Sequence, residues 1–114
     1  GTGPGKDEGP PPEPKPTYTE LSWSAKMERP VLISGPSQPE YPRSAMLQHR
    51  EGTVLARCLI ATDGAVRNCS IMSGDVMLQD AALAALAQQR YRPLYYGGVP
   101  VGVWYVFRFT FKLQ

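Results

Sequence analysis

The chain has 114 residues, enough for one small domain, and its 12 basic and 10 acidic side chains give a net charge of +2. Because the arginines are scattered and the basic surplus is small, the composition argues against a nucleic-acid-binding surface. No apolar run reaches the roughly 18 residues that a membrane-spanning helix needs, so no segment is expected to cross a bilayer.

The first part of the chain is rich in proline and glycine. Residues 1–16 hold six of the 12 prolines and four of the 11 glycines. Such a segment has too little apolar surface to offset its ordering entropy, which predicts disorder or extended polyproline II. We therefore expect a linker over residues 1–26 and a folded domain over residues 27–114, with its core in 38–114. The start Gly-Thr-Gly, without Met, indicates a C-terminal piece of a longer protein, and any membrane anchor would lie upstream of residue 1.

Two short elements are expected before the main sheet. The apolar run Val31-Leu32-Ile33, ended by Ser34-Gly35-Pro36, is typical of an extra edge strand. Residues 43–50 are expected to form a short helix after Pro42, which suits a first helical turn because its missing N–H costs nothing there. Ala45 and His49 are expected among its inward-facing side chains.

A β-hairpin follows. Residues 53–61 alternate between apolar and polar faces, and Asp63-Gly64 is a strong signal for a two-residue turn into a return strand over residues 65–72. The apolar positions of the return strand change face between Val66 and Cys69. This change predicts a β-bulge, which leaves the pairing register uncertain by one residue.

The two cysteines flank this hairpin. A two-residue loop pairs positions whose numbers sum to 127, and Cys58 and Cys69 satisfy that sum. Cross-strand Cβ atoms lie about 4.5–5.5 Å apart, close enough for a disulfide after modest adjustment. We expect a Cys58–Cys69 disulfide, which indicates an extracytoplasmic compartment; two buried free thiols are the alternative. Two cysteines and the distant His49 do not make a zinc site, and no metal or other cofactor is expected.

A second helix is expected over residues 79–90. Asp80 in its first turn and Arg90 in its last would both favour the helix dipole. Its sheet-facing stripe consists of Ala82, Leu83, Leu86 and Ala87.

The last strand has the clearest pattern of all. Residues 101–113 alternate without a break after the turn residues Gly97, Gly98 and Pro100, and at about 3.4 Å per residue this strand is unusually long. One face carries Val101, Val103, Tyr105, Phe107, Phe109, Phe111 and Leu113. Trp104 lies on the opposite face, where either the N-terminal segment or a partner would cover it.

These elements predict a small α+β domain with the order αββαβ. The sheet is expected to be three-stranded and antiparallel, with strand order 2-1-3, two helices on one face and a right-handed crossover. The last strand then lies at an edge, and a long apolar edge is a hazard unless it accepts another strand. Because His49 is the only histidine and no nucleophile motif is present, we expect no enzyme activity.

An ordered set of short motifs resembles the C-terminal domain of TonB-type energy transducers over residues 38–114. The motifs are Gln38-Pro39-Glu40-Tyr41-Pro42, Glu51-Gly52-Thr53-Val54, Asp63-Gly64-Ala65-Val66, Ser73-Gly74, Ala81-Ala82-Leu83, Tyr91-Arg92-Pro93 and Gly98-Val99-Pro100-Val101. The proline-rich lead-in resembles the periplasmic spacer of such proteins. The cysteine pair departs from the best-known members.

The resemblance implies a periplasmic domain of an inner-membrane-anchored protein, driven by an ExbB/ExbD-like motor. Such a domain grips the TonB box of an outer-membrane transporter by strand addition, in which main-chain hydrogen bonds give affinity with little sequence demand. The same fold linking a motor to a cell-surface or motility complex is the alternative. Isolated fragments can also pair with each other as homodimers through the long edge.

The resemblance also indicates which residues would contact the partner. They belong to the segment before Pro42 and to the last strand: Gln38, Pro39, Tyr41, Val101, Val103, Trp104, Tyr105, Val106, Phe107, Arg108 and Phe109.

Overall fold

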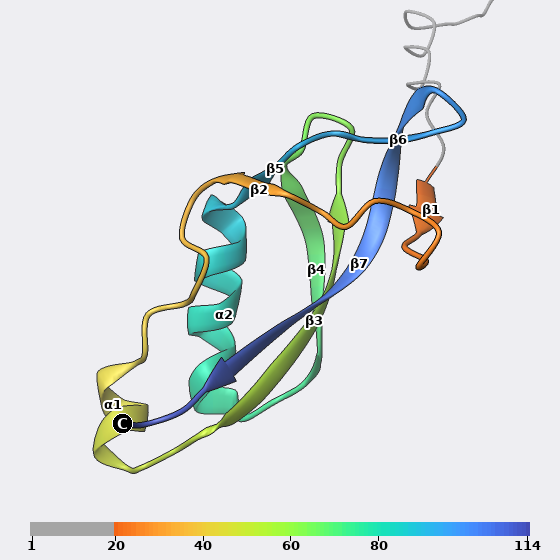
Figure 1. Cartoon of the computed structure of the whole chain (residues 1–114). Helices are drawn as coiled ribbons and strands as arrows, with labels where there is room; N and C mark the ends of the chain where they lie inside the picture. The colour runs from red at the N-terminus through yellow and green to blue at the C-terminus, as the bar shows by residue number, and fades with distance from the viewer. Residues whose placement is uncertain (1–19) are drawn as a thin grey trace, which may run out of the picture.

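The computed structural model describes residues 20–114 (Figure 1). Its elements are β1 (Glu20–Ser22), β2 (Leu32–Ser34), α1 (Arg43–Leu47), β3 (Gly52–Ile60), β4 (Val66–Ser73), α2 (Val76–Gln88), β5 (Arg90–Tyr91), β6 (Leu94–Tyr96) and β7 (Val99–Phe111). Residues 1–19 of the predicted linker lie outside the described residues. Residues 20–22, also predicted as linker, form a strand of the sheet. No helix in the described part is long and apolar enough to cross a membrane.

The α+β fold is confirmed, and its sheet is wider than predicted. β4, β3 and β7 are antiparallel neighbours, in the predicted order 2-1-3. The sheet has five strands rather than three, because β1 pairs in parallel with β7 and β6 pairs with the start of β7. Gly97 and Gly98, with φ of 63° and 82°, make the tight turn between β6 and β7. β1 has only three residues, which is too few for an alternating pattern of apolar and polar residues to predict a strand from the sequence.

The helix layer covers one face of this sheet. α2 contacts β3 and β4, and α1 contacts α2 at the end of the domain where the chain terminates (Figure 1). α2 begins at Val76 rather than at residue 79, because the Asp75 side chain caps it by accepting a 2.9 Å hydrogen bond from Met77 N. Arg90 belongs to β5 and not to the last helical turn.

The sheet-facing stripe of α2 also differs from its prediction. The buried residues are Leu78, Ala82, Ala85 and Leu86. Leu83 is only half-buried and Ala87 is exposed. The early start explains why the prediction missed Leu78, which lies one turn before the predicted stripe.

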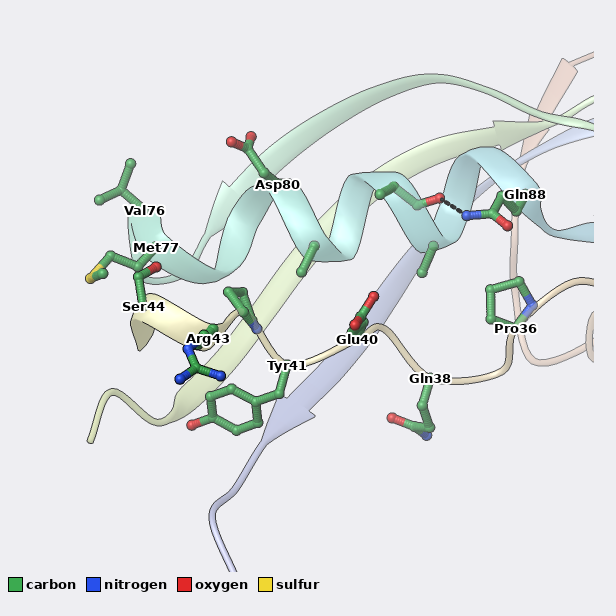
Figure 2. Close-up of a pocket in the computed structure, with 14 residues that line it drawn as sticks. Pro36, Gln38, Glu40, Tyr41, Arg43, Ser44, Val76, Met77, Asp80 and Gln88 are labelled. Atoms are coloured by element: carbon green, nitrogen blue, oxygen red, sulfur yellow. Dashed lines mark hydrogen bonds between the residues drawn. The ribbon is translucent and has the colours of Figure 1, made fainter. Parts of the chain in front are cut away.

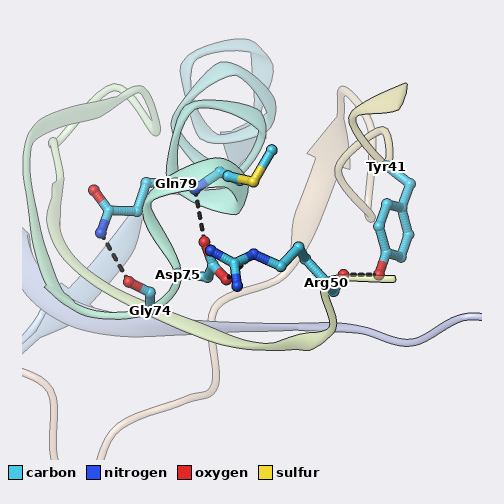
Figure 3. A network of polar contacts seen from close by, with 6 residues as sticks. Tyr41, Arg50, Gly74, Asp75 and Gln79 are labelled. Carbon is cyan, nitrogen blue, oxygen red and sulfur yellow. Dashed lines mark hydrogen bonds and ion pairs between the residues drawn. The ribbon is translucent and has the colours of Figure 1, made fainter. Parts of the chain in front are cut away.

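The first helix is shorter than predicted. It ends at Leu47, and His49 then takes a left-handed conformation with φ of 54°, which places its side chain in solvent rather than inward. Figure 3 shows how the following turn is held: the Tyr41 hydroxyl donates to the carbonyl oxygen of Arg50, and Arg50 Nε lies 3.2 Å from Asp75 Oδ2. The cap of α2 is thus tied to the segment that precedes β3.

The turn of the main hairpin is one residue longer than predicted. Ala61 N donates to Ala65 O and Gly64 N donates to Ala61 O, both at 2.8 Å, so residues 62–64 form the loop. Gly64 has a φ of 87°, and a Cβ there would lie 1.9 Å from the carbonyl oxygen of Tyr91. Only glycine fits, because the loop must reverse direction while it touches the chain that follows α2.

The predicted β-bulge is confirmed at Asn68, whose φ is 54°. The β3–β4 register shifts between Arg57 and Leu59, opposite this residue. The longer turn and the bulge move the register in opposite directions, so their effects cancel at the cysteines. Cys58 and Cys69 form the predicted disulfide, with Cα atoms 4.1 Å apart, and Cys58 is fully buried.

Candidate partner-binding edge

Only the second half of β7 presents an edge. β1 pairs with Gly102, Val103 and Trp104, and Trp23 N donates a 2.9 Å hydrogen bond to Trp104 O. Beyond that bond no strand within residues 20–114 covers the outer side of β7, which pairs only with β3. We call residues 105–111 the open edge. The predicted edge position of the last strand is therefore wrong over its first half.

The hydrogen bond from Trp23 also shows which backbone groups of the open edge point outward. In a strand, the N–H and C=O of one residue point to the same side, and successive residues alternate. Since Trp104 O points toward β1, the backbone groups of Val106 and Arg108 point outward as well. Those of Tyr105 and Phe107 point toward β3. This alternation cannot be read from the sequence.

A cavity of about 380 Å³ lies along the open edge. We call it the edge cavity, and its lining consists of Pro30, Leu32, Ser37, Gln89, Tyr91, Tyr105, Val106, Phe107, Arg108 and Phe109. Its aromatic wall is closely packed: the ring centroids of Tyr105 and Phe107 lie 5.1 Å apart, and those of Tyr91 and Phe107 lie 5.6 Å apart. The cavity can therefore receive an apolar side chain from a strand added beside β7.

A buried amide holds the far wall of the edge cavity. Gln89 is only 5% exposed, and its Nε2 donates a 2.9 Å hydrogen bond to Pro36 O. Its Oε1 accepts a 2.7 Å hydrogen bond from the Tyr91 hydroxyl. Burial, with a smaller contribution from Tyr105, raises the pKa of Tyr91 to about 12, so this hydroxyl stays a donor at neutral pH. The sequence carried no signal for Gln89, which lay within a predicted helix.

The side chains on the face of β7 opposite the helix layer make different contacts. The Arg57 guanidinium lies 4.4 Å from the centroid of the Trp104 ring, in the geometry of a cation–π contact. Trp104 Nε1 donates a 3.1 Å hydrogen bond to Glu20 Oε1. The N-terminal segment therefore covers Trp104 in part. Val106 and Arg108 remain exposed on this face.

The segment before α1 borders a second, larger cavity of about 800 Å³, between residues 36–44 and α2 (Figure 2). Gln38 and Tyr41 line this cavity, and Figure 2 shows both side chains pointing away from α2. Tyr41 reaches the end of β7, where its ring stands edge-on to that of Phe111 with centroids 5.4 Å apart. Pro39 is half-buried.

Apart from Pro39, which lines neither cavity, the predicted contact residues separate into three groups. Tyr105, Val106, Phe107, Arg108 and Phe109 come together at the open edge and its cavity. Val101, Val103 and Trp104 already pair with β6 or β1. Gln38 and Tyr41 border the second cavity. Within the described residues, no three His, Cys, Asp or Glu side chains are grouped so that they could hold a metal ion.

Comparisons with known proteins show which family the chain resembles in sequence and fold. The family model described as Gram-negative bacterial TonB protein C-terminal matches residues 37–113. The chain is 32% identical over 90 residues to Protein TonB of Vibrio cholerae, a match that covers 77% of this chain and 37% of that protein. A solution NMR structure of the TonB C-terminal domain of Pseudomonas aeruginosa shares the fold with a TM-score of 0.63 and 23% identity, covering 82% of this chain and 93% of that one. The chain thus spans little more than a third of the Vibrio relative's length.

Proposed function

Since the chain belongs to the family of Gram-negative bacterial TonB protein C-terminal domains, we propose that it binds a partner and transmits force to it, without catalysis. The partner is the TonB-box segment of an outer-membrane transporter, which adds as a strand to the open edge. The domain lies in the periplasm, and an inner-membrane anchor and an ExbB/ExbD-like motor act through the part of the protein that precedes this chain.

The observation that carries the proposal is the open edge itself. Val106 and Arg108 point their backbone groups away from β3, beside a cavity with an aromatic wall. An added strand would form main-chain hydrogen bonds with these groups, and its side chains on one face would enter the cavity. Main-chain pairing demands little of the partner's sequence, so one domain can serve several transporters.

The arrangement also suits the transmission of force. β7 is the longest strand, with 13 residues, and it pairs with β3 along nine successive positions from Gly52 to Ile60. A pull along an added strand is parallel to β7. It therefore loads several of the hydrogen bonds between the two strands together instead of opening them one at a time. The disulfide between β3 and β4 links β4 covalently to this hydrogen-bonded pair of strands.

A pair of substitutions at Val106 tests strand addition. Val106→Pro removes an outward N–H and places a ring where the added strand would lie, while the pairing with β3 is kept. Val106→Ala is the matched control, because it shortens the side chain and keeps the N–H. Calorimetric titration of the full chain with a synthetic TonB-box peptide should show binding at least about tenfold weaker for the proline variant than for the alanine variant. Equal affinities in two folded variants would reject strand addition at this edge.

A further inference from the structure

We propose that β1 and Trp23 form a fixed stop at one end of the open edge, so that an added strand pairs only with β7 beyond Trp104. This inference rests on the proposed strand addition. It goes beyond that proposal because it assigns the length of the segment that fits and the position on β7 at which its pairing ends.

The stop follows from the geometry of the outer side of β7. β1 pairs in parallel with Gly102, Val103 and Trp104, on the side where the added strand would lie. Neighbouring strands lie about 4.8 Å apart, so two strands cannot occupy the same stretch of one edge. A segment added beside residues 105–111 would therefore be collinear with β1, and one of its ends would meet Trp23.

Several contacts beyond strand pairing hold the stop in place. The Trp23 ring stands edge-on to Tyr105, with centroids 5.5 Å apart. Its Nε1 donates a 2.9 Å hydrogen bond to the carbonyl oxygen of Glu28. Met27 N donates to Ser24 O at 2.9 Å, so a tight turn follows directly after Trp23 and ends the pairing of β1 with β7. Because Leu21, Trp23 and Met27 also pack against the core, a partner would have to disrupt side-chain packing to displace β1.

The stop limits what the partner can be. Residues 105–111 accommodate a segment of about seven residues at roughly 3.4 Å per residue. Further residues at the end of the segment next to β1 would add no affinity, because β1 already pairs with that stretch of β7. The side chains of the segment that face the helix layer would lie beside Tyr105, Phe107 and Phe109 in the edge cavity, so apolar residues fit at alternate positions. The fitting partner is thus a short extended segment with alternate apolar residues, whose paired part ends at Val106.

Two proline substitutions in β1 give a matched test. Trp23 N points toward β7, and by alternation the N–H of Leu21 does so too, whereas that of Ser22 points away. Leu21→Pro should therefore release β1, while Ser22→Pro should leave it paired. Each full-length variant is titrated with a TonB-box peptide of about seven residues and with the same peptide lengthened by about three residues at each end. Circular dichroism confirms that the rest of the domain is folded.

The wild type and Ser22→Pro should bind the two peptides equally well, and only Leu21→Pro should bind the longer peptide more tightly, by about tenfold. In the wild type, the exchange rate of the Leu21 amide should not change when either peptide binds. A wild type that prefers the longer peptide, with faster exchange at Leu21, would show that the partner displaces β1 and would overturn the stop. A Leu21→Pro variant that gains nothing from the longer peptide would overturn it too. Failure of both peptides to bind any variant would instead reject the strand addition on which the inference rests.

Discussion

The hydroxyl of Tyr91 donates a hydrogen bond to Oε1 of Gln89, with the two oxygens 2.7 Å apart. The same amide donates from Nε2 to the carbonyl oxygen of Pro36, at 2.9 Å. One buried side chain therefore links β5, the end of α2 and the segment that separates the two cavities. Ser37 lines the edge cavity, whereas Pro36 and Gln38 line the second one.

Substitution of this amide should destabilise the domain. Gln89→Leu leaves the buried Tyr91 hydroxyl and the Pro36 carbonyl without their partners, which should cost about 1–3 kcal/mol of unfolding free energy in urea. Gln88→Leu is the matched control, because Gln88 is exposed and, within residues 20–114, its amide hydrogen-bonds only to Ala84 O of its own helix. The control should stay within about 0.5 kcal/mol of the wild type. Similar losses in both variants would mean that the buried amide has no special role.

Tyr91 should make the stability of the domain depend on pH in alkaline solution. Burial raises its pKa in the folded state from 10.0 to about 12. The folded state therefore keeps a proton that the unfolded state releases, and unfolding is favoured as pH rises. The contribution of Tyr91 is fully present below pH 10 and is lost as pH rises through 10 to about 12.

Urea unfolding at a series of pH values checks this expectation. Tyr91→Phe should flatten the decline in stability between pH 10 and 12. Tyr95→Phe, which alters a tyrosine that is 60% exposed, should leave the decline as it is in the wild type. An unchanged pH profile in Tyr91→Phe would contradict the assignment.

The disulfide should contribute to stability without forming part of the partner-binding edge. Cys58 and Cys69 close a loop with a sequence separation of 11, for which chain entropy predicts about 3 kcal/mol. The double variant Cys58→Ala/Cys69→Ala should lose stability of this order, and the reduced wild type should lose a similar amount. A TonB-box peptide should still bind the folded variant, since both cysteines lie on β3 and β4, away from the outer side of β7. An unfolding curve identical to that of the oxidised wild type would contradict the prediction.

Strong periodic patterns in the sequence predicted the core of the fold. The long alternation in β7 placed Phe107, Phe109 and Phe111 correctly on the buried face. The disulfide was also predicted, although the argument assumed a shorter turn. The register came out right because the bulge at Asn68 offsets the extra turn residue.

The parts that define the open edge were not predictable in the same way. β1 is three residues long, so its pairing is decided by tertiary contacts such as Trp23 on Tyr105 and not by local pattern. The direction of each N–H along β7 depends on which neighbour it faces, which only the assembled sheet determines. Gln38 was assigned to the same site as Val106 by resemblance alone, and the structure places it at a different cavity.

Amide hydrogen exchange in the presence of a TonB-box peptide tests the central claim most directly. If the peptide adds as a strand, exchange should slow at Val106, Arg108 and Thr110, whose N–H groups point outward. The amides of Tyr105, Phe107 and Phe109 should change little, because they already pair with β3. Binding that leaves the three outward amides unchanged, or that slows exchange only along residues 36–44 and α2, would contradict strand addition at the open edge.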